Sequence, residues 1–502
     1  MDKIAIIDIG SNSMRIVIVK ISKDRAYEVL DELKYSVRLG KDMTENGALS
    51  EDRIKAAMEA LAHFKRLCDA NNVNKIIAVA TEAVRKASNK IEFIKMVKEK
   101  FQIDVRILTG EEESYYDYLG VINSIDIQSG LIVDIGGSSM ELILVKNRSI
   151  KNCISVPMGA ITLTDKLLSI DGDIYKKSKG LIKYIKEVFN SIDFLKEVEN
   201  VPLIGIGGSF RTVGKVHRNK VSYPFNNSHN YVISRKDIIQ IYNSLKYKEI
   251  SKYREVKGIS KDRWDIFPGA FIAIVTLVKY CNFKKVIISG NGIRQGLIYK
   301  MTITSDDHVI ENMLNFSLNT IIHNFNLNQE HVKRVWEFSK EISKNIVPEL
   351  YSNNSNYKIL KTAAYLHDCG VFIGSNRQTK YSFSIVRDIK IYGLTHRQQL
   401  MAAFVISNFE DYKIRKSYYF GSIIKNKDVV LIQKMNVILN IAKALDRASD
   451  GNIVDVKISS DKDKVLLKIK SKMSPSLELT TVSYYEYNFE QVFGKKLIVN
   501  YK

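Results

Sequence analysis

Two short stretches are the most informative about the architecture: Ile7-Asp-Ile-Gly-Ser-Asn-Ser13 and Val133-Asp-Ile-Gly-Gly-Ser-Ser139. Each follows an apolar run rich in β-branched residues and precedes a second such run, which predicts two strands joined by a tight polar turn. The stretches lie about 126 residues apart and form a weak internal repeat. We therefore predict an α/β fold with duplicated halves. The alternative is two ordinary hairpins that use Gly and Asn for positive φ angles.

The residues around these stretches alternate between predicted strands and helices, as α/β folds do. We expect strands at 4–9, 14–19, 76–80, 105–108, 131–135 and 140–145, and helices at 51–70, 91–101 and from 111 onwards. Two further glycine-rich turns, at 205–209 and 289–294, follow the predicted strands 201–204 and 286–288. Beyond about residue 305 the apolar residues recur at helical spacing, and 453–470 alternates like a β-hairpin.

The net charge of the chain is strongly positive. It has 76 Lys and Arg residues against 55 Asp and Glu, which gives +21. The excess is concentrated, because residues 210–263 contain 13 basic and 4 acidic residues, and 370–434 contain 11 and 4. A positive field of this kind favours a polyanionic ligand, namely polyphosphate, a highly phosphorylated nucleotide or RNA. The alternative interpretation is a lysine-rich solvated surface.

The other bulk features are typical of a globular protein of the cytoplasm. The 502 residues, 45% of them hydrophobic, suit about three or four domains. The longest uncharged apolar stretch, 266–278, is too short to span a bilayer, and the N-terminal run predicts a buried strand rather than a secretory signal. Because Cys68, Cys153, Cys281 and Cys369 lie far apart, we expect neither a disulfide framework nor a thiolate zinc site.

The polar turns carry the chemistry expected of a phosphate site. A strand that ends in Asp and is followed by Gly and hydroxylic residues offers backbone N–H groups and hydroxyls to phosphate oxygens. The Asp offers a carboxylate to a divalent metal or to an attacking water. Two such turns in register suggest halves that close on one phosphate chain between them.

At these motifs the chain resembles the actin/sugar-kinase fold and, more narrowly, the exopolyphosphatase / guanosine pentaphosphate phosphohydrolase family. The matching stretches are Asp8-Ile-Gly-Ser-Asn-Ser13, Asp134-Ile-Gly-Gly-Ser-Ser-Met-Glu-Leu142, Gly205-Ile-Gly-Gly-Ser209, Thr81-Glu-Ala-Val-Arg-Lys-Ala87, Leu108-Thr-Gly-Glu-Glu-Glu113 and Ser289-Gly-Asn-Gly-Ile-Arg-Gln-Gly296. The resemblance runs nearly end to end and is most specific up to residue 300. It implies two ribonuclease H-like domains (1–125 and 126–302), an all-α HD-like domain (303–450), a small α/β C-terminal domain (451–502) and a homodimer.

The resemblance also implies roles for individual residues. Glu113 corresponds to the general base, and Asp134 and Glu141 are the other catalytic carboxylates. Asp8, Asp134 and Glu141 are the expected ligands of a divalent metal, Mg²⁺, because polyphosphate repels hydroxide unless its charge is neutralised. The expected phosphate-binding residues are Gly10, Ser11, Asn12, Ser13, Arg15, Arg85, Gly136, Gly137, Ser138, Ser139, Gly207, Gly208 and Ser209.

The three glutamates at 111–113 require separate interpretations. If Thr109 caps a helix, Glu112 stands at its third position and completes a capping box. Glu113 is then available for catalysis, and near a helix N-terminus its carboxylate is expected to stay ionised at neutral pH, as a base for water must. The alternative is three acids that are favoured only by the helix macrodipole.

The helical third contains a second candidate site. His331, His367-Asp368 and Asp446 occur in the order of the HD metal-phosphohydrolase signature, and imidazoles with carboxylates on converging helices can hold a divalent metal. The HD-like domains of the family's longer members often carry an incomplete motif and serve binding and dimer contacts. The alternative is structural, with a helix that stops near Gly370 and a core histidine at 367.

We therefore predict an exopolyphosphatase, a processive and metal-dependent hydrolase of the terminal phosphoanhydride of inorganic polyphosphate. A guanosine pentaphosphate (pppGpp) 5′-phosphohydrolase that uses the same residues is the close alternative. A non-catalytic sensor of polyanions or of alarmones such as ppGpp is the alternative of a different class, and the intact carboxylate set argues against it. The glutamate cluster and the basic charge argue against a sugar or acid kinase.

Overall fold

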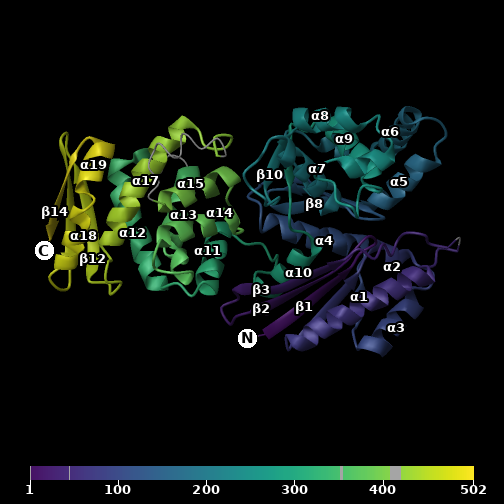
Figure 1. Cartoon of the computed structure of the whole chain (residues 1–502), viewed down its shortest axis with the longest axis horizontal. Helices are drawn as coiled ribbons and strands as arrows, with labels where there is room; N and C mark the ends of the chain where they lie inside the picture. The colour runs from purple at the N-terminus through teal and green to yellow at the C-terminus, as the bar shows by residue number, and fades with distance from the viewer. Residues whose placement is uncertain (1, 45, 351–353, 408–419, 502) are drawn as a thin grey trace. The chain divides into compact units, whose positions relative to one another are not determined.

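The structure, a computed structural model, describes residues 2–44, 46–350, 354–407 and 420–501. It divides into two compact units, shown in Figure 1. Unit 1 contains the chain up to residue 223 together with 227–311, and unit 2 contains 224–226 and the chain from 312 onwards. The predicted division into four domains is finer than this and stays a prediction.

Unit 1 contains two mixed β-sheets with related strand orders. The first is ordered β3-β2-β1-β4-β5, with β1, β2 and β3 antiparallel and with β4 and β5 parallel to β1. Its strands are β1 (Asp2–Ile9), β2 (Met14–Ile21), β3 (Tyr27–Tyr35), β4 (Lys75–Ala80) and β5 (Val105–Ile107). The expected strands at 4–9, 14–19, 76–80 and 105–108 are thus confirmed.

The second sheet repeats this order and adds one antiparallel edge strand, which gives β10-β11-β9-β6-β7-β8. Its strands are β6 (Gly130–Ile135), β7 (Met140–Lys146), β8 (Ser149–Val156), β9 (Leu203–Ile206), β10 (Tyr231–Ser234) and β11 (Lys285–Ile288). In each sheet an Asp-Ile-Gly turn joins the central strand to its antiparallel neighbour. The duplication predicted from the two sequence stretches is therefore present in the strand order.

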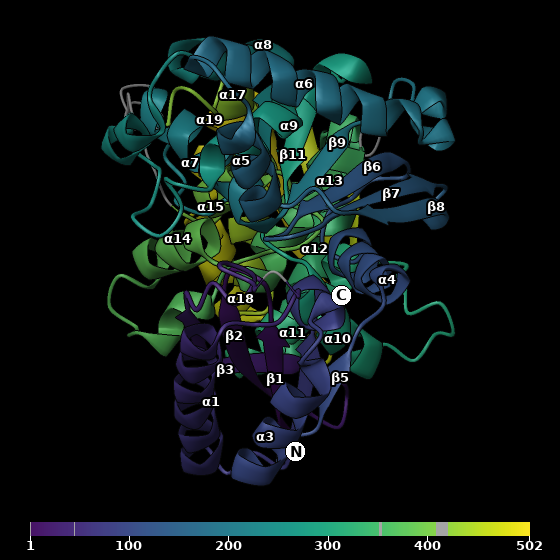
Figure 2. The ribbon, with the colours of Figure 1, turned by 90° about the vertical axis from the view of Figure 1, so that its right-hand side faces the viewer.

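Helices pack against both sheets of unit 1. They are α1 (Glu51–Ala70), α2 (Glu82–Lys86), α3 (Lys90–Phe101), α4 (Gly110–Ile122), α5 (Ala160–Ser169), α6 (Ile174–Asn190), α7 (Gly207–Lys220), α8 (Arg235–Leu245), α9 (Phe267–Tyr280) and α10 (Ile293–Thr302), with short 3₁₀ turns at Asp193–Glu197 and Ile250–Glu255. We call the β1–β5 sheet with α1–α3 lobe I, and the β6–β11 sheet with α5–α9 lobe II. The helices α4 and α10 lie side by side between the lobes (Figures 1 and 2).

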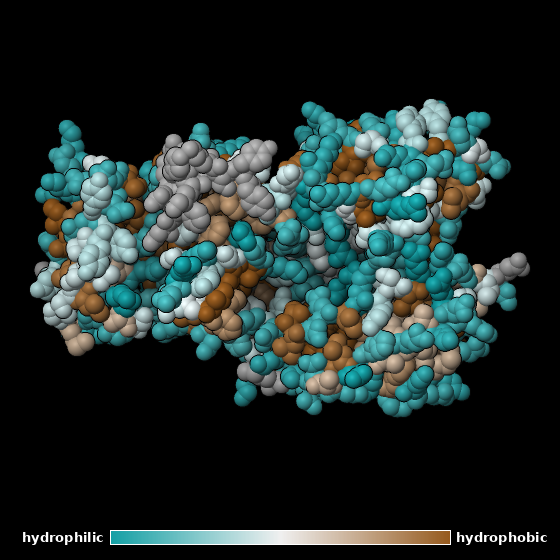
Figure 3. All heavy atoms as spheres, viewed as in Figure 1, coloured by the Kyte–Doolittle hydropathy of each residue, from teal (hydrophilic) through white to brown (hydrophobic). Residues whose placement is uncertain are grey.

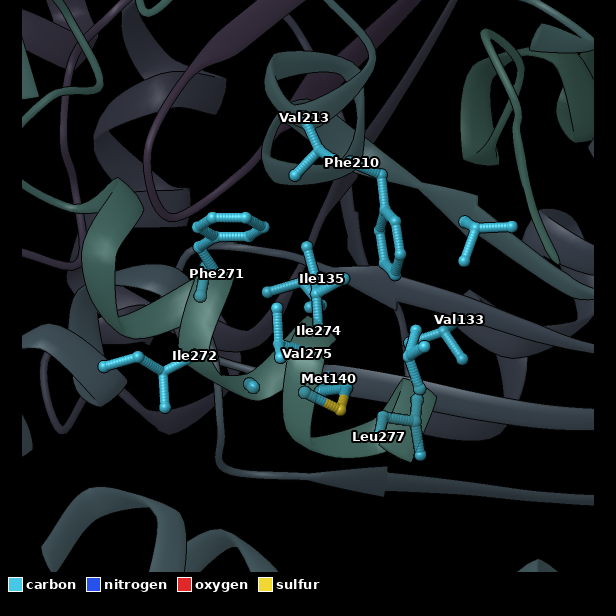
Figure 4. Packing of buried hydrophobic residues seen from close by; sticks show 14 of the residues in the cluster. Val133, Ile135, Met140, Phe210, Val213, Phe271, Ile272, Ile274, Val275 and Leu277 are labelled. Carbon is cyan, nitrogen blue, oxygen red and sulfur yellow. The ribbon is translucent and has the colours of Figure 1, made fainter. Parts of the chain in front are cut away.

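The core of lobe II explains the long apolar stretch near residue 270. Helix α9 is buried along nearly its whole length, because it packs between the sheet and neighbouring helices. Figure 4 shows this packing for Phe271, Ile274 and Leu277 of α9, Ile135 and Met140 of the sheet, and Phe210 of α7. A run that is apolar on all sides is thus a core helix. Within the described part of the chain, every helix is too short or too polar to cross a membrane.

Unit 2 is helical and ends in a small sheet. Its helices are α11 (Met313–Asn324), α12 (Gln329–Ile346), α13 (Asn354–Leu366), α14 (Gln378–Asp388), α15 (His396–Ile406) and α17 (Asn426–Ala444), with 3₁₀ turns at Pro348–Leu350 and Cys369–Phe372. The final segment forms β12 (Ile453–Ser460), β13 (Lys464–Ser471), α18 (Ser476–Ser483), α19 (Glu486–Phe493) and β14 (Lys496–Tyr501). The predicted hairpin is β12–β13, and β14 joins it in parallel.

Candidate active site

The two Asp-Ile-Gly turns pack directly against each other. A Cβ atom added to Gly137 would lie 2.7 Å from Cβ of Ser11 and 3.1 Å from the backbone nitrogen of Asn12. A Cβ added to Gly159 would lie 2.3 Å from the carbonyl carbon of Gly137. The glycines therefore permit a backbone approach that any larger residue would prevent. The approach brings the predicted phosphate turns at 10–13 and 136–139 together.

The third predicted turn lies beside Asp134. Gly207 has φ +85°, and a Cβ there would lie 2.4 Å from Oδ1 of Asp134. Residues 207–209 form the first turn of α7 rather than a loop, because the helix begins at Gly207 directly after β9. Their backbone N–H groups are thus those of a helix N-terminus, which is a favourable place for a phosphate.

Three carboxylates gather at the second turn. Asp134 and Glu141 are directly opposite each other in the β6–β7 register, and Asp117 of α4 completes a group whose carboxylate oxygens lie within 4.8 Å of one another. Glu141 is 2% exposed and Asp117 is fully buried. Like charges placed directly opposite on a sheet destabilise it. The group therefore requires protons or a cation between its oxygens.

Asp117 is the member of this group that the sequence analysis missed. Neither of its carboxylate oxygens accepts a hydrogen bond from any described residue. Oδ1 of Asp134 likewise accepts no hydrogen bond from a described residue. The local signal was its position one helical turn after Glu113, which places both carboxylates on the same face of α4. Buried polar groups are almost always paired, so these unpaired oxygens fit ligands of a divalent cation.

Close packing of α4 on α10 positions the face of α4 that bears Glu113 and Asp117. A Cβ at Gly120 would lie 2.6 Å from the carbonyl oxygen of Gly292, and one at Gly296 would lie 2.0 Å from that of Tyr116. The fourth glycine-rich turn therefore holds α4 in place, and with it Glu113 and Asp117. The capping box is confirmed, since the Thr109 hydroxyl accepts from the Glu112 N–H at 3.1 Å and Glu112 accepts from the Thr109 N–H at 2.9 Å.

Glu113 is 3% exposed and bonded to Arg85. The same guanidinium also bonds to Glu82 and donates to the carbonyl oxygen of Leu108 at 2.5 Å. Arg85, expected from the resemblance to contact phosphate, thus holds Glu113 in place. Burial, with a further contribution from Glu141, raises the pKa of Glu113 to about 9. This contradicts the expectation of an ionised carboxylate, because desolvation outweighs the modest effect of the helix N-terminus.

The pKa values of the other two catalytic candidates, Asp134 and Glu141, are raised as well. Burial raises the pKa of Asp134 to about 6, although the nearby charge of Arg211 opposes the shift. Burial and the charge of Asp134 raise the pKa of Glu141 to about 7, although Ser155 donates a 2.8 Å hydrogen bond to its Oε1. Carboxyls with pKa values this close to neutrality are typical of functional sites.

Asp8, the equivalent of Asp134 in the first turn, has a different neighbour. Its cross-strand partner is Arg15, and it is not part of the three-carboxylate group. Burial raises the pKa of Asp8, and the charges of Arg294 and Arg15 oppose that shift. The first turn is therefore locally balanced in charge, whereas the second is not.

Four arginines surround the turns: Arg15, Arg211, Arg263 and Arg294. Burial and the charge of Arg294 lower the pKa of Arg15 to about 10, and burial together with the charge of Arg15 lowers that of Arg211 to about 9. Guanidinium groups that repel one another in this way are suited to binding an anion of several charges.

Arg263 was missed because its position depends on contacts between the lobes. Asp262 pairs with Lys34 of lobe I at 2.6 Å, and Asp265 pairs with Arg38 at 2.6 and 2.9 Å. These flanking pairs hold the guanidinium of Arg263 against Gly208, where an added Cβ would lie 1.9 Å from its central carbon. Figure 3 shows hydrophilic residues where the two lobes meet on the face drawn.

Comparisons with known proteins identify the family of this chain. The model of the Ppx/GppA phosphatase family matches residues 17–305, and the model of domain III of that family matches 315–486. The chain belongs to the Ppx/GppA phosphatase family. Members of the family are phosphatases, so the resemblance seen in the sequence motifs is confirmed at this level.

The chain is also similar to individual proteins of described activity. A bifunctional 3-dehydroquinate synthase/phosphatase of Fusobacterium nucleatum is 30% identical over 59% of the chain, and the match spans 46% of that protein. A guanosine-5′-triphosphate,3′-diphosphate pyrophosphatase of Aeromonas hydrophila is 22% identical over 93% of the chain and 92% of its own length.

Solved structures of the Ppx/GppA family match the N-terminal 60% of the chain. The Aquifex aeolicus family member is 28% identical with a TM-score of 0.51, and the match covers 97% of that chain. An exopolyphosphatase from Cytophaga hutchinsonii is 25% identical with a TM-score of 0.56, and 98% of that chain is covered. The α/β architecture predicted for this part is thus confirmed.

Proposed function

We propose that the chain is a metal-dependent phosphoanhydride hydrolase that removes end phosphates from inorganic polyphosphate. The observation that carries the proposal is the like-charge pair of Asp134 and Glu141, joined by the unpaired Asp117 and facing the buried Glu113. A purely binding protein has no need to bury four carboxyls beside its phosphate turns.

Asp117, Asp134 and Glu141 are the proposed ligands of a divalent cation. All-oxygen donors suit Mg²⁺, and Asp117 replaces Asp8 of the original expectation because the charge of Asp8 is countered by Arg15. When bound, such a cation supplies positive charge that neutralises the anhydride oxygens and lowers the pKa values of the surrounding carboxyls.

The chain's own residues perform the remaining steps. The backbone N–H groups and hydroxyls of residues 10–13, 136–139 and 207–209 bind the terminal phosphates. Arg15, Arg211 and Arg263 bind the negatively charged phosphates that come next along the polymer. Glu113, kept in position by Arg85, takes the proton of the attacking water on its carboxylate. The water then attacks the end phosphorus in line, and the shortened chain leaves as the anion.

The charge distribution favours a long polymer as substrate. The 13 basic residues of 210–263 include Arg211 and Arg263, which lie beside the turns. A chain of phosphates can remain bound to such a stretch after each cleavage, which supports repeated release from one molecule. A second candidate substrate is pppGpp, because the similarity to the Aeromonas pyrophosphatase extends over 93% of the chain.

The test is phosphate release from long-chain polyphosphate and from pppGpp, measured in parallel with Mg²⁺. Faster release per active site from polyphosphate, abolished by Glu113→Gln, is the expected result. Preferential release from pppGpp would assign the same residues to the nucleotide. Tight binding of polyphosphate and pppGpp without phosphate release would indicate a polyanion sensor. It would overturn the catalytic roles proposed for the carboxylates.

A further inference from the structure

Unit 2 contains a second group of potential metal ligands, separate from the carboxylates of unit 1. His331 lies in the first turn of α12, His367 and Asp368 follow α13, and Asp446 follows α17. His331 is 7% exposed and His367 is fully buried, whereas the Asp368 side chain is 30% exposed. The group thus has one side that water can reach.

Three atoms of this group form a compact triangle. Nε2 of His331 lies 3.2 Å from Nε2 of His367 and 3.4 Å from Oδ2 of Asp368, and the latter two atoms are 3.2 Å apart. Ligands bound tetrahedrally at about 2.1 Å from one metal ion are separated by roughly 3.4 Å. The triangle therefore has the size that one shared ion requires.

The outer hydrogen bonds leave lone pairs in the middle of the triangle. Nδ1 of His367 is 2.8 Å from the carbonyl oxygen of Ala364, which can only accept, so this nitrogen carries the proton. Nδ1 of His331 is 2.7 Å from Oδ2 of Asp446. The same oxygen accepts a 2.9 Å hydrogen bond from Nε of Arg334. When both rings are neutral, as metal ligands must be, their Nε2 atoms are acceptors that face each other and the carboxylate of Asp368.

We propose that His331, His367 and Asp368 bind one divalent transition-metal ion of the Zn²⁺ or Co²⁺ type. Asp446 was expected to be a ligand, but its position behind His331 makes it the carboxylate that orients the imidazole, an arrangement common at such centres. Asp368 also accepts from the amide of Gln378, which limits its rotation. The water-accessible side at Asp368 leaves a coordination position for solvent.

Charge and donor type favour a transition metal over Mg²⁺ at this place. Arg334 bonds to Asp446, and Lys443 lies within electrostatic range of Asp368, so the two carboxylates are already largely neutralised. Affinity must then come from the imidazole nitrogens, which prefer Zn²⁺, Co²⁺, Fe²⁺ or Ni²⁺ to magnesium. The competing explanation is a proton between the same atoms, which would hold the group together without a metal.

Metal content of the full chain separates these explanations. The protein is stripped with a chelator, loaded with Zn²⁺ in excess Mg²⁺ to occupy the carboxylates of unit 1, desalted and analysed for metal. We expect one Zn²⁺ per wild-type chain and a loss to none in His367→Gln and in the isosteric Asp368→Asn. Co²⁺ loading is expected to give visible absorption with imidazole ligands, lost in the same variants.

Two controls complete the experiment. His396→Gln changes another buried imidazole of unit 2, one stacked on Phe225, and is expected to keep one Zn²⁺ per chain. Glu141→Gln, in the carboxylate group of unit 1, is expected to keep it as well. Far-UV circular dichroism checks that each variant folds. A wild-type chain that retains no Zn²⁺, or folded His367→Gln and Asp368→Asn variants that retain as much as wild type, would overturn the proposal.

Discussion

Asp134 and Glu141 face each other across the β6–β7 pair as two carboxylates at directly opposed positions. The corresponding positions of the first sheet hold Asp8 and Arg15, which have opposite charges. The two repeated turns differ at several positions, and the exchange of arginine for glutamate here is the only one that changes the charge. This single difference leaves the second turn with unbalanced negative charge and makes it the expected place of the cation.

Removing one charge of the opposed pair is expected to have opposite effects with and without metal. In chelator at mildly alkaline pH, Glu141→Gln should raise the thermal midpoint by about 1–2 °C, since it relieves a repulsion of about 1 kcal/mol in a unit of about 300 residues. Added Mg²⁺ should raise the thermal midpoint of wild type, and this increase should be absent in Glu141→Gln. Calorimetry with and without Mg²⁺ measures both, with exposed Glu111→Gln as the control. A lower metal-free midpoint with an unchanged Mg²⁺ effect would contradict this.

The stability of the metal-free protein is expected to fall as pH rises. Glu113, Glu141 and Asp134 have pKa values of about 9, 7 and 6, each above the ordinary value of a carboxyl in an unfolded chain. The folded state therefore binds their protons more tightly, and this contribution is fully present below about pH 4 and lost through pH 6–9. Thermal midpoints in chelator across this range measure the loss, and Mg²⁺ should reduce the slope.

Asp117→Asn tests the carboxylate that sequence reasoning missed. The amide keeps the volume but removes one charged ligand, so the Mg²⁺ concentration for half-maximal activity should rise about tenfold or more. The midpoint in chelator should change little, because burial and the charges of Asp134 and Glu141 raise the pKa of Asp117 well above its usual value and leave the metal-free carboxyl protonated. Magnesium titrations of phosphate release measure the first effect. An unchanged Mg²⁺ requirement would exclude Asp117 as a ligand.

Glu113→Gln and Glu112→Gln form a matched pair on one helix turn. Glu113→Gln should lower kcat by about 10²–10⁴, the usual contribution of a general base, while polyphosphate binding is retained. Glu112→Gln preserves the capping box, in which Gln can replace Glu, and should retain wild-type kcat. Steady-state kinetics and equilibrium binding distinguish the two. Equal losses of kcat in both variants would point to a damaged helix rather than to a missing base.

Arg263 is expected to contribute to binding rather than to proton transfer. Arg263→Ala should lower kcat/KM for polyphosphate about tenfold or more, mostly through KM, because a charge-assisted phosphate contact contributes about 1.5–3 kcal/mol. It should also reduce the salt dependence of binding. Lys261→Ala, at an exposed position two residues away, is the control. A similar effect in both variants would indicate only the loss of net charge.

The features that the sequence predicted are those encoded over short distances along the chain. The strands around both Asp-Ile-Gly turns, the α1 helix and the capping box of Thr109 and Glu112 all depend on neighbouring residues. Asp134 and Glu141 lie opposite each other because a strand–turn–strand pattern of known length sets the register, while their metal-binding role stays a prediction.

Tertiary structure alone decided the features that depend on burial and on contacts between distant segments. Asp117 joins the carboxylates only because α4 packs on α10, and Arg263 reaches Gly208 only because two ion pairs join the lobes. The raised pKa of Glu113 follows from desolvation, and the place of Asp446 behind His331 follows from how the helices of unit 2 pack. Local turns follow from neighbouring residues in the chain, whereas folding fixes which charges meet and how much water surrounds them.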